Sequence, residues 1–417
     1  MEKHKIAFVN PRIEIRDSFF DNPAFCMTGM LYAASEAKAE GHIVDVLDSF
    51  LEGEVRSNVR RYKDKYHIIG TDPDTMAKRV SEKDPDIVIV NYSDFHREIK
   101  LVSRSLKRLL ELISSPYRKI ILANFHLSEC MKYFNFSEDD VMAALPEIDS
   151  IMNGYFSDSS LGCGKDEGSI RDFQDFGLID PEMVDYHRYQ EFFNEMSTKG
   201  LVKEHETGER IFPMFTSRGC NFRCFFCSSK KGIWKPLDMH HIERNITTAK
   251  ANGVSKIFVL DLLANMDRDR FGHILETIIK NGMKVHFSNG LRIDLLDEKT
   301  IRYLSECTDI LSVSIESGDQ SVVDRIIKKN LDLEKAEYNA GLISKYKIRC
   351  YAHYMTHSPG ESESEIRKTE EMARRFEKDY GIVSRIQPYV PASAENGFDG
   401  QGNNMISRRF TLAEKEI

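Results

Sequence analysis

The sequence predicts an α/β protein in which a doubly wound, Rossmann- or flavodoxin-like domain precedes a partial (β/α)6 TIM barrel. Short apolar runs rich in β-branched residues alternate with helical patterns along most of the 417 residues, and this alternation is typical of parallel sheets covered by helices. The alternation is interrupted once, over residues 158–206. At roughly 150 residues per domain, the length fits two or three folding units.

The first predicted domain, residues 1–157, contains five expected strands. They lie at residues 6–9, 43–47, 87–90, 120–122 and 148–152. The helical patterns of this domain lie at residues 29–40, 98–112 and 139–145. The run I-V-I-V at 87–90 has no polar residue, as expected of a parallel strand covered on both faces. Ligands of such sheets bind at the carboxyl ends of the strands.

Residues 158–206 are acidic, rich in Tyr and Phe and poor in strand signals, so we expect a connector with a helix near 181–196. The barrel is predicted over residues 207–395 and is followed by a C-terminal tail, 396–417. Its six expected strands lie at 211–216, 256–261, 284–288, 310–315, 349–355 and 383–388. Its expected helices lie at 240–252, 269–281, 297–306, 320–327, 333–345 and 364–378. Chemistry in such barrels is carried by the loops after the strands.

Composition and charge restrict the classes of partner. Hydrophobic residues make up 41% and charged residues 30% of the chain, an ordinary water-soluble mixture. Lys and Arg (58) against Asp and Glu (66) give a net charge of −8, which offers no broad cationic surface to a nucleic acid. No window approaches the ~18 apolar residues of a membrane span, and no signal-peptide core precedes the first strand. We therefore expect a cytoplasmic protein that binds neither nucleic acid nor membrane and acts on a small molecule.

Three of the eight cysteines form one motif directly after the first barrel strand. Cys220, Cys224 and Cys227 have the spacing C-x3-C-x2-C. Clustered thiols in a reducing compartment indicate metal or redox chemistry, and three thiolates can hold three irons of a [4Fe–4S] cluster while the fourth stays open. Zinc normally takes a fourth Cys or His, and the nearest histidines, His240 and His241, belong to no second C-x2-C. A non-catalytic iron–sulfur or zinc protein remains the alternative.

The segment T-S-R-G-C-N-F-R-C-F-F-C-S-S, residues 216–229, resembles the signature of radical S-adenosylmethionine (SAM) enzymes. The resemblance extends over about residues 207–395. It implies that SAM binds the open iron through its amino and carboxylate groups and is cleaved reductively to methionine and a 5′-deoxyadenosyl radical, which abstracts hydrogen from the substrate. It also implies an external electron donor such as flavodoxin or ferredoxin.

The strand L-S-V-S-I-E-S-G, residues 311–318, resembles the fourth strand of SAM radical enzymes that carry a cobalamin-binding domain. Its alternation places Ser312, Ser314 and Glu316 on one face, which we expect to point into the barrel. The resemblance implies that Glu316 accepts hydrogen bonds from the ribose or the ammonium of SAM; a solvated glutamate in a turn is the alternative.

Other cofactor contacts are implied by the same resemblance. They are Phe225 and Phe226 beside the adenine, Asp261 after the second strand, Arg292 after the third, Ser314 on the fourth, Lys328 after the fourth and Gly360 in the turn after the fifth. An ordinary salt bridge of Arg292 and a solvated pair of Lys328 and Lys329 remain alternatives. The residues that we expect at the mouth as substrate contacts are Tyr351, His353, Tyr354, His357 and Tyr389. We expect Cys307 and Cys350 to be buried, inert thiols.

Residues 1 to about 156 resemble the cobalamin-binding fold, through K-I-A-F-V-N-P, G-M-L-Y-A-A-S-E-A-K-A-E-G-H-I-V-D-V-L-D and P-D-I-V-I-V-N-Y-S. The chain departs from that family in lacking D-x-H-x-x-G, in having Ala123-Asn124 where relatives have Gly-Gly, and in its reduced turn Asn153-Gly154-Tyr155. The resemblance implies a methyltransferase-type enzyme that methylates a secondary metabolite with cobalamin. A radical SAM enzyme without functional cobalamin, catalysing rearrangement, cyclisation, oxidation or epimerisation, is the alternative.

Overall fold

The structure is a computed structural model that describes residues 3–16, 25, 27–62, 66–92, 103–124, 142, 145–153, 178–202, 208–227, 233–389 and 410–411. The chain divides into two compact units. The first comprises Met1–Glu209 with Ser393–Asn403, and the second Arg210–Ala392 with Asn404–Ile417. Among the described residues, no helix is both long enough and apolar enough to span a membrane.

The first unit is built on a five-stranded sheet with the order β3-β1-β6-β7-β8. Its strands are β1 (Lys5–Asn10), β3 (Ile43–Asp48), β6 (Ile87–Asn91), β7 (Lys119–Asn124) and β8 (Ser150–Asn153). All neighbouring pairs are parallel. The chain reverses its direction of travel across the sheet between β1 and β6, as in flavodoxin-like folds. The predicted doubly wound α/β class is confirmed.

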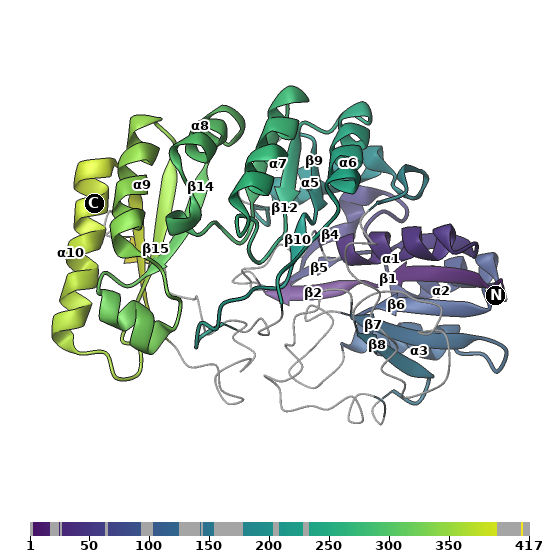
Figure 1. Cartoon of the computed structure of the whole chain (residues 1–417). Helices are drawn as coiled ribbons and strands as arrows, with labels where there is room; N and C mark the ends of the chain where they lie inside the picture. Colours follow the sequence, from purple (N-terminus) through teal and green to yellow (C-terminus); the bar gives the residue numbers. More distant parts are fainter. Residues whose placement is uncertain are drawn as a thin grey trace. The chain divides into compact units, whose positions relative to one another are not determined.

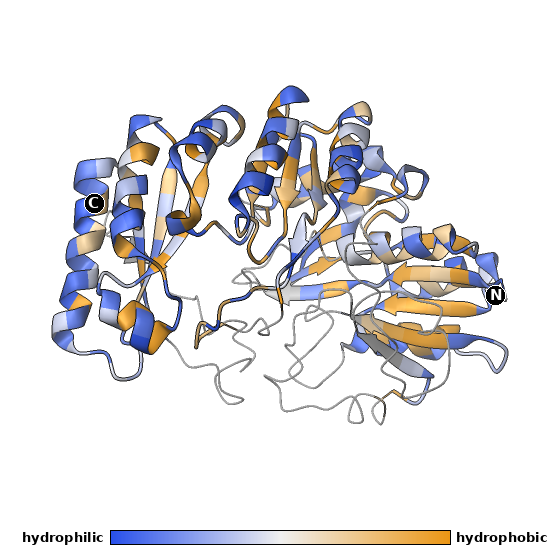
Figure 2. Cartoon of the chain, viewed as in Figure 1, coloured by the Kyte–Doolittle hydropathy of each residue, from blue (hydrophilic) through white to orange (hydrophobic). Residues whose placement is uncertain are grey.

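Helices cover both faces of this sheet because its strands are apolar on both sides. The helices are α1 (Thr28–Ala39), α2 (Pro73–Lys83) and α3 (Arg104–Ile113). Val88 and Val90 pack with Leu106 and Leu110 of α3 in one core cluster, whereas the intervening Ile89, also fully buried, points to the other face. Figure 2 shows the strands as hydrophobic and the outer sides of the helices as hydrophilic.

A second, antiparallel sheet in this unit was not predicted from the sequence. It has the order β2-β5-β4, with β2 (Ile13–Arg16), β4 (Val59–Tyr62) and β5 (Tyr66–Ile69). The strands are short and interrupted by Arg and His, so they lack the apolar run that marks the parallel strands. Of the predicted helix 139–145, only residues 142 and 145 lie within the described part of the chain.

The predicted helix near 181–196 is present as a 3-10 turn, η7 (Pro181–Met183), followed by α5 (Tyr186–Thr198). This helix belongs to the first unit. Phe192 stacks on Phe50 with ring centroids 4.9 Å apart, and Phe193 meets the edge of Phe25 at 5.6 Å. Aromatic packing therefore attaches the end of the expected connector to the first sheet.

The second unit contains six parallel strands in chain order within its described part. They are β9 (Ile211–Met214), β12 (Lys256–Val259), β13 (Lys284–Phe287), β14 (Leu311–Glu316), β15 (Cys350–Thr356) and β16 (Val383–Pro388). Two groups, β9-β12-β13 and β14-β15-β16, are each hydrogen-bonded. An isolated parallel bridge between Leu291 and Val313 links the groups. This is the predicted arrangement of a partial barrel.

Helices follow the strands and lie outside them, as Figure 1 shows. They are α6 (Met239–Ala251), α7 (Arg268–Lys280), α8 (Glu298–Cys307), the π-helical turn η9 (Val322–Ile327), α9 (Leu333–Lys345) and α10 (Glu363–Tyr380). Side chains cap the helix starts: Asp297 of α8 and Ser362 of α10 both form capping boxes. Each cap fixes where a βα loop ends, and these loops carry the candidate site.

Candidate functional site

Alternation along β14 and β15 separates an inner from an outer face. Leu311, Val313 and Ile315 of β14 are fully buried, whereas Ser312, Ser314 and Glu316 are partly exposed. On β15 the buried residues are Cys350, Ala352, Tyr354 and Thr356, and the partly exposed ones are Tyr351, His353 and Met355. The inner face is therefore the polar one, and Ser312 Oγ lies 2.9 Å from His353 Nε2 on it.

Tyr354 lies on the outer face, in contrast to our expectation that it faces the mouth. Its ring meets Phe376 of α10 edge-on at 6.2 Å, and burial raises its pKa. Cys350 is buried on the same face. Cys307 of α8 is also buried, and its thiol donates to the Tyr303 carbonyl. Burial raises the pKa of Cys307 to about 12 and that of Cys350 as well. Both thiols are held protonated and away from the inner face.

The loop that carries the three clustered cysteines is held at its base by a short antiparallel ladder. β10 (Ser217–Arg218) pairs with β11 (Lys235–Pro236). Gly219 has φ +74°, and a Cβ at this position would lie 2.4 Å from the Ile233 carbonyl oxygen. The Phe225 amide donates to the Ile327 carbonyl at the end of η9, 3.0 Å away. These contacts fix the loop at the carboxyl end of β9.

Asp261, after β12, is fully buried and fixes the start of the same loop. Its carboxylate accepts hydrogen bonds from the Thr216 amide at 2.7 Å, the Thr216 hydroxyl at 2.5 Å and the Ser217 hydroxyl at 2.6 Å. Burial raises the pKa of Asp261, although these bonds oppose the shift. The structure thus gives Asp261 three contacts within the protein where the resemblance implied contact with the SAM ammonium.

Of the two adjacent lysines, the one that lies at the site is Lys329 and not the expected Lys328. Lys329 is buried, and its Nζ lies 2.8 Å from both Glu316 Oε1 and the Ser314 carbonyl oxygen. Lys328 has φ +58° and an exposed side chain. Glu316 itself has φ +74°, an unfavourable conformation for a side chain of this size. Strained residues that are held by surrounding contacts concentrate at functional sites.

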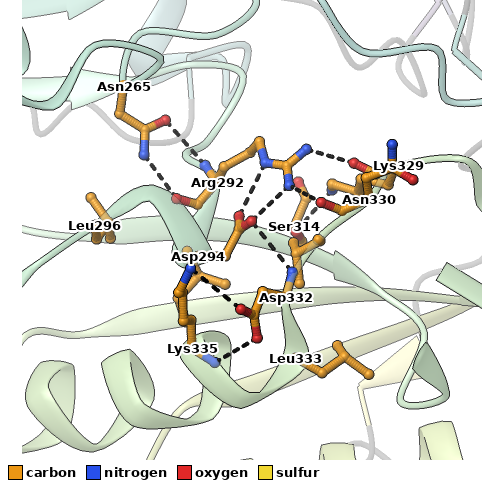
Figure 3. A network of polar contacts seen from close by, with 12 residues as sticks. Asn265, Arg292, Asp294, Leu296, Ser314, Lys329, Asn330, Asp332, Leu333 and Lys335 are labelled. Carbon is orange, nitrogen blue, oxygen red and sulfur yellow. Dashed lines mark hydrogen bonds and ion pairs between the residues drawn. The ribbon is translucent and has the colours of Figure 1, made fainter. Parts of the chain in front are cut away.

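Arg292 is the centre of a buried polar network next to the cysteine loop (Figure 3). Its Nε and Nη2 bind the two oxygens of Asp294 at 3.0 and 2.7 Å. Nη1 donates to the Lys329 carbonyl and Nη2 to the Asn330 carbonyl, at 2.7 and 2.9 Å. Its Cζ also lies 3.7 Å from the centroid of the Phe222 ring, which belongs to the cysteine loop. Arg292 therefore connects this loop to residues 329–330, as a buried ion pair and not as a surface salt bridge.

The thiols lie close enough together to affect one another's protonation. Cys220 and Cys224 are half-buried and Cys227 is exposed. Burial raises the pKa of Cys220, and that of Cys224 to about 11, while the charge of Lys329 opposes both shifts. Among the described residues, no three His, Cys, Asp or Glu side chains gather at the spacing of a single metal ion. Three thiols on one loop, next to cations, match the donor set of a cluster with an open corner, and iron must displace their protons on binding.

Aromatic side chains adjoin the thiols. Phe225 meets Phe226 edge-on at 5.8 Å and Tyr389, after β16, at 5.0 Å. His357 is exposed with φ +61°, and its Nδ1 lies 3.0 Å from the Thr356 hydroxyl. Gly360 has φ +84°, and nothing lies within 4 Å of a Cβ built there. The glycine is therefore required by the turn and not by a close approach within the protein.

At the carboxyl edge of the first unit's sheet, polar residues from three strands meet where the strand order reverses. Asn10 of β1 donates to Asp48 of β3, and Asn91 of β6 donates to Asn10, both at 2.8 Å. The Tyr189 hydroxyl of α5 donates to Asp48 at 2.6 Å. Burial raises the pKa of Asp48 to about 6. Of the positions at which the chain departs from the cobalamin-binding family, Ala123 is buried, and residues 154 and 155 lie outside the described residues.

Sequence reasoning missed three residues of the barrel site. Asp294, two residues after Arg292 in the run R-I-D, was given no role, although that spacing was the available signal for the ion pair. Lys329 was named only as the neighbour of Lys328. Arg385 of β16 points to the inner face, where its Cζ lies 3.7 Å from the centroid of the Tyr351 ring. In the strand V-S-R-I-Q-P, Arg385 follows Ser384 and therefore lies on the opposite face of the strand. This alternation is the sequence signal that could have identified Arg385.

Comparisons with known proteins identify a family model that matches most of the second unit. Residues 214–373 match the family model described as the Radical SAM superfamily. The chain is 24% identical over 374 residues to the uncharacterized methyltransferase PH0819 of Pyrococcus horikoshii, covering 87% of this chain and 76% of that protein. It is 22% identical over 352 residues to the cytidylyl-2-hydroxyethylphosphonate methyltransferase of Streptomyces wedmorensis, covering 74% of this chain and 65% of that protein.

A solved structure is similar in fold to both units. It is the radical S-adenosylmethionine methyltransferase TsrM of Kitasatospora setae, determined with cobalamin and a [4Fe–4S] cluster bound. The TM-score is 0.61 at 13% sequence identity, and the match covers 93% of this chain and 75% of TsrM. This likeness shows the fold: an N-terminal domain with a parallel sheet, followed by a partial barrel.

Proposed function

We propose that this protein, whose residues 214–373 match the Radical SAM superfamily, is a radical SAM enzyme that uses the 5′-deoxyadenosyl radical to activate a carbon of a small molecule for methylation with cobalamin. The observation that carries the proposal is the position of Cys220, Cys224 and Cys227. They lie on one loop after β9, and the charges of Lys329 and Glu316 act in opposite directions on the pKa of the Cys224 thiol. Activity of this kind needs a cluster with one open iron next to a cavity that excludes competing hydrogen donors.

The three cysteines would hold a [4Fe–4S] cluster, which when bound supplies the electron that cleaves SAM. Lys329 and Arg292 provide positive charge near the thiolates, and this charge favours their ionised form. Lys329 also orients the Glu316 carboxylate through its 2.8 Å contact, and we propose that Glu316 accepts hydrogen bonds from the ribose or ammonium of SAM. Phe225, Phe226 and Tyr389 would pack beside the adenine and exclude water.

The proposal of methylation is supported by the first unit and by the relatives. The strand order reverses between β1 and β6, and in open α/β sheets this point is where ligands bind. Both curated relatives are named methyltransferases, and TsrM was solved with cobalamin. We propose that the carboxyl edge of the first sheet binds the corrin, and that flavodoxin or ferredoxin is the electron donor.

The cluster assignment is tested with a pair of cysteine variants. Cys224→Ala should lose most of the iron bound on reconstitution and all reductive SAM cleavage, while its far-UV circular dichroism is unchanged. Cys307→Ala is the control, because that thiol is buried in α8 on the outer side. Undiminished 5′-deoxyadenosine formation by the Cys224 variant would refute the assignment.

The corrin is tested separately from the radical. Protein reconstituted with hydroxocobalamin should retain about one equivalent through gel filtration, followed by its visible absorbance. Retention of the cluster and of SAM cleavage without any cobalamin would favour rearrangement, cyclisation, oxidation or epimerisation of the substrate instead.

A further inference from the structure

Arg385 lies on the inner face of β16, near the middle of the strand. The preceding Ser384 faces α10, because its hydroxyl donates to the Ala373 carbonyl at 2.9 Å and its amide donates to Glu377 at 3.0 Å. Successive side chains of a strand point to opposite faces. Arg385 therefore points away from the helix, and its stacking on Tyr351 of the neighbouring strand confirms the direction.

Arg385 brings a positive charge to this face, and no carboxylate within the described part of the chain balances it. Its guanidinium carbon lies 3.7 Å from the centroid of the Tyr351 ring, and its Nε is buried without a hydrogen-bond partner. Among the described residues, no carboxylate forms an ion pair with it, in contrast to Arg292, whose fork is filled by Asp294. Stacking on a ring uses the face of the guanidinium and leaves its N–H edge for hydrogen bonds.

The groups around Arg385 form a polar layer below the Glu316–Lys329 pair. Arg385 is in register with His353, and His353 is in register with Ser314. Glu316 is the next inward-facing residue after Ser314 toward the carboxyl end of β14. The contact of His353 with the Ser312 hydroxyl lies in the same region. A molecule lying below SAM would therefore meet Arg385, with His353 and Ser312 alongside.

An unbalanced guanidinium within a protein is costly unless a ligand pairs with it. Its planar fork matches carboxylates and phosphate-like groups, which it can bind through two parallel hydrogen bonds. We infer that Arg385 is the substrate-recognition residue of this enzyme and that the substrate carries an anionic group, a carboxylate or a phosphonate or phosphate, which this fork binds. The inference rests on the proposed function for the identity of the bound molecule as substrate.

The test measures binding of three small probes of similar size to the reconstituted, SAM-bound protein by ligand-observed NMR. The probes are ethylphosphonate, propionate and the neutral propionamide. At least one anion should bind about tenfold or more tightly than propionamide, since a hydrogen-bonded charge pair contributes more than a neutral bond. The stronger of the two anions identifies the substrate's acidic group.

Three variants isolate the role of Arg385. Arg385→Gln should weaken binding of the preferred anion about tenfold or more, and Arg385→Lys should retain part of it because the charge remains without the fork. Arg349→Gln is the control. It removes the same charge from an exposed residue at the amino end of β15. It should leave anion binding unchanged.

The outcomes separate this inference from the proposed function. Unchanged anion binding by Arg385→Gln, or no anion binding by the wild type, would overturn the inference. Weakened binding of SAM with unchanged probe binding would also overturn it, because Arg385 would then serve the SAM carboxylate. If wild-type protein binds the anion through Arg385 but forms no 5′-deoxyadenosine, the anion site stands and the radical function fails.

Discussion

Lys328 and Lys329 show how one backbone dihedral decides which of two identical side chains joins a site. Lys328 takes a left-handed conformation, φ +58°, at the end of η9. The chain turns there, so that Lys329 is buried against Glu316 and Lys328 is exposed. The sequence offers no signal for this difference, because both residues are lysines in the same local context.

The two lysines form a matched pair for mutation. Lys329→Met should lower the free energy of unfolding by about 3 kcal/mol, because it leaves a buried carboxylate without its cation. Lys328→Met should change it by no more than about 0.5 kcal/mol, as for most exposed positions. Urea denaturation of the two variants measures the difference. Equal effects would contradict the assignment of Lys329 as the buried partner.

Arg292 should be irreplaceable even by another cation. Arg292→Lys retains the charge but loses the paired bonds to Asp294 and the two bonds to the carbonyls of Lys329 and Asn330. We expect reduced iron content on reconstitution, since Phe222 loses its stacking partner, together with a loss of about 3 kcal/mol in unfolding free energy. The exposed Arg268, paired with Asp297, is the control, and its lysine variant should stay within about 1 kcal/mol.

At the scale of elements, the shape of the cysteine loop depends on one glycine. Gly219→Ala would place a Cβ 2.4 Å from the Ile233 carbonyl in a backbone with φ +74°. Because that oxygen belongs to the backbone, the β10–β11 ladder would have to shift. We expect the variant to fold but to lose most of its cluster, measured as iron per chain after reconstitution.

Gly360→Ala is the matched control for this prediction. Gly360 shares the positive φ, at +84°, but has no atom within 4 Å of the added Cβ. Its variant should therefore show only the strain of the left-handed conformation, about 1–2 kcal/mol, with full iron content. Equal iron loss in both variants would contradict the role assigned to the contact between residue 219 and the Ile233 carbonyl.

The elements that sequence patterns predict well are those whose burial is periodic. The six barrel strands lie within two residues of their predicted bounds, because most of them are apolar or alternating runs separated by helical patterns. The same alternation of side chains along a strand places Ser312, Ser314 and Glu316 on one face. It also separates Tyr354 from Tyr351 and His353, and applying it to β15 would have removed Tyr354 from the expected contacts. Contacts between residues distant in sequence, such as those of Arg292 with the carbonyls of residues 329–330, have no periodic signature.

At the scale of the whole chain, each unit encloses a buried carboxylate that joins separate segments. Asp261 joins the end of β12 to the start of the cysteine loop in the second unit. Asp48 joins β3, β1 and α5 in the first. Both have a raised pKa caused by burial. The stability of the chain should therefore depend on pH through interior groups as well as through surface charge.

Asp48 gives the clearest case, because its pKa is about 6 in the folded chain against an ordinary value of 3.8. Between these values the folded state holds a proton that the unfolded state has released, so stability should fall as pH rises through this window. A difference of about two pKa units corresponds to a loss of about 3 kcal/mol above pH 6.

Asp48→Asn should remove this dependence while keeping the network, because the amide can accept from Asn10 and the Phe50 amide and donate to the Tyr189 oxygen. Urea denaturation of the cluster-free chain at about pH 4 and about pH 7 tests this: the variant should gain about 3 kcal/mol relative to wild type between the two. The exposed Asp84, which has a left-handed φ of 46° that asparagine tolerates, provides the control substitution Asp84→Asn. A wild-type pH dependence that Asp48→Asn leaves intact would show that Asp48 is ionised in the folded chain throughout, stabilised by Tyr189 and Asn10.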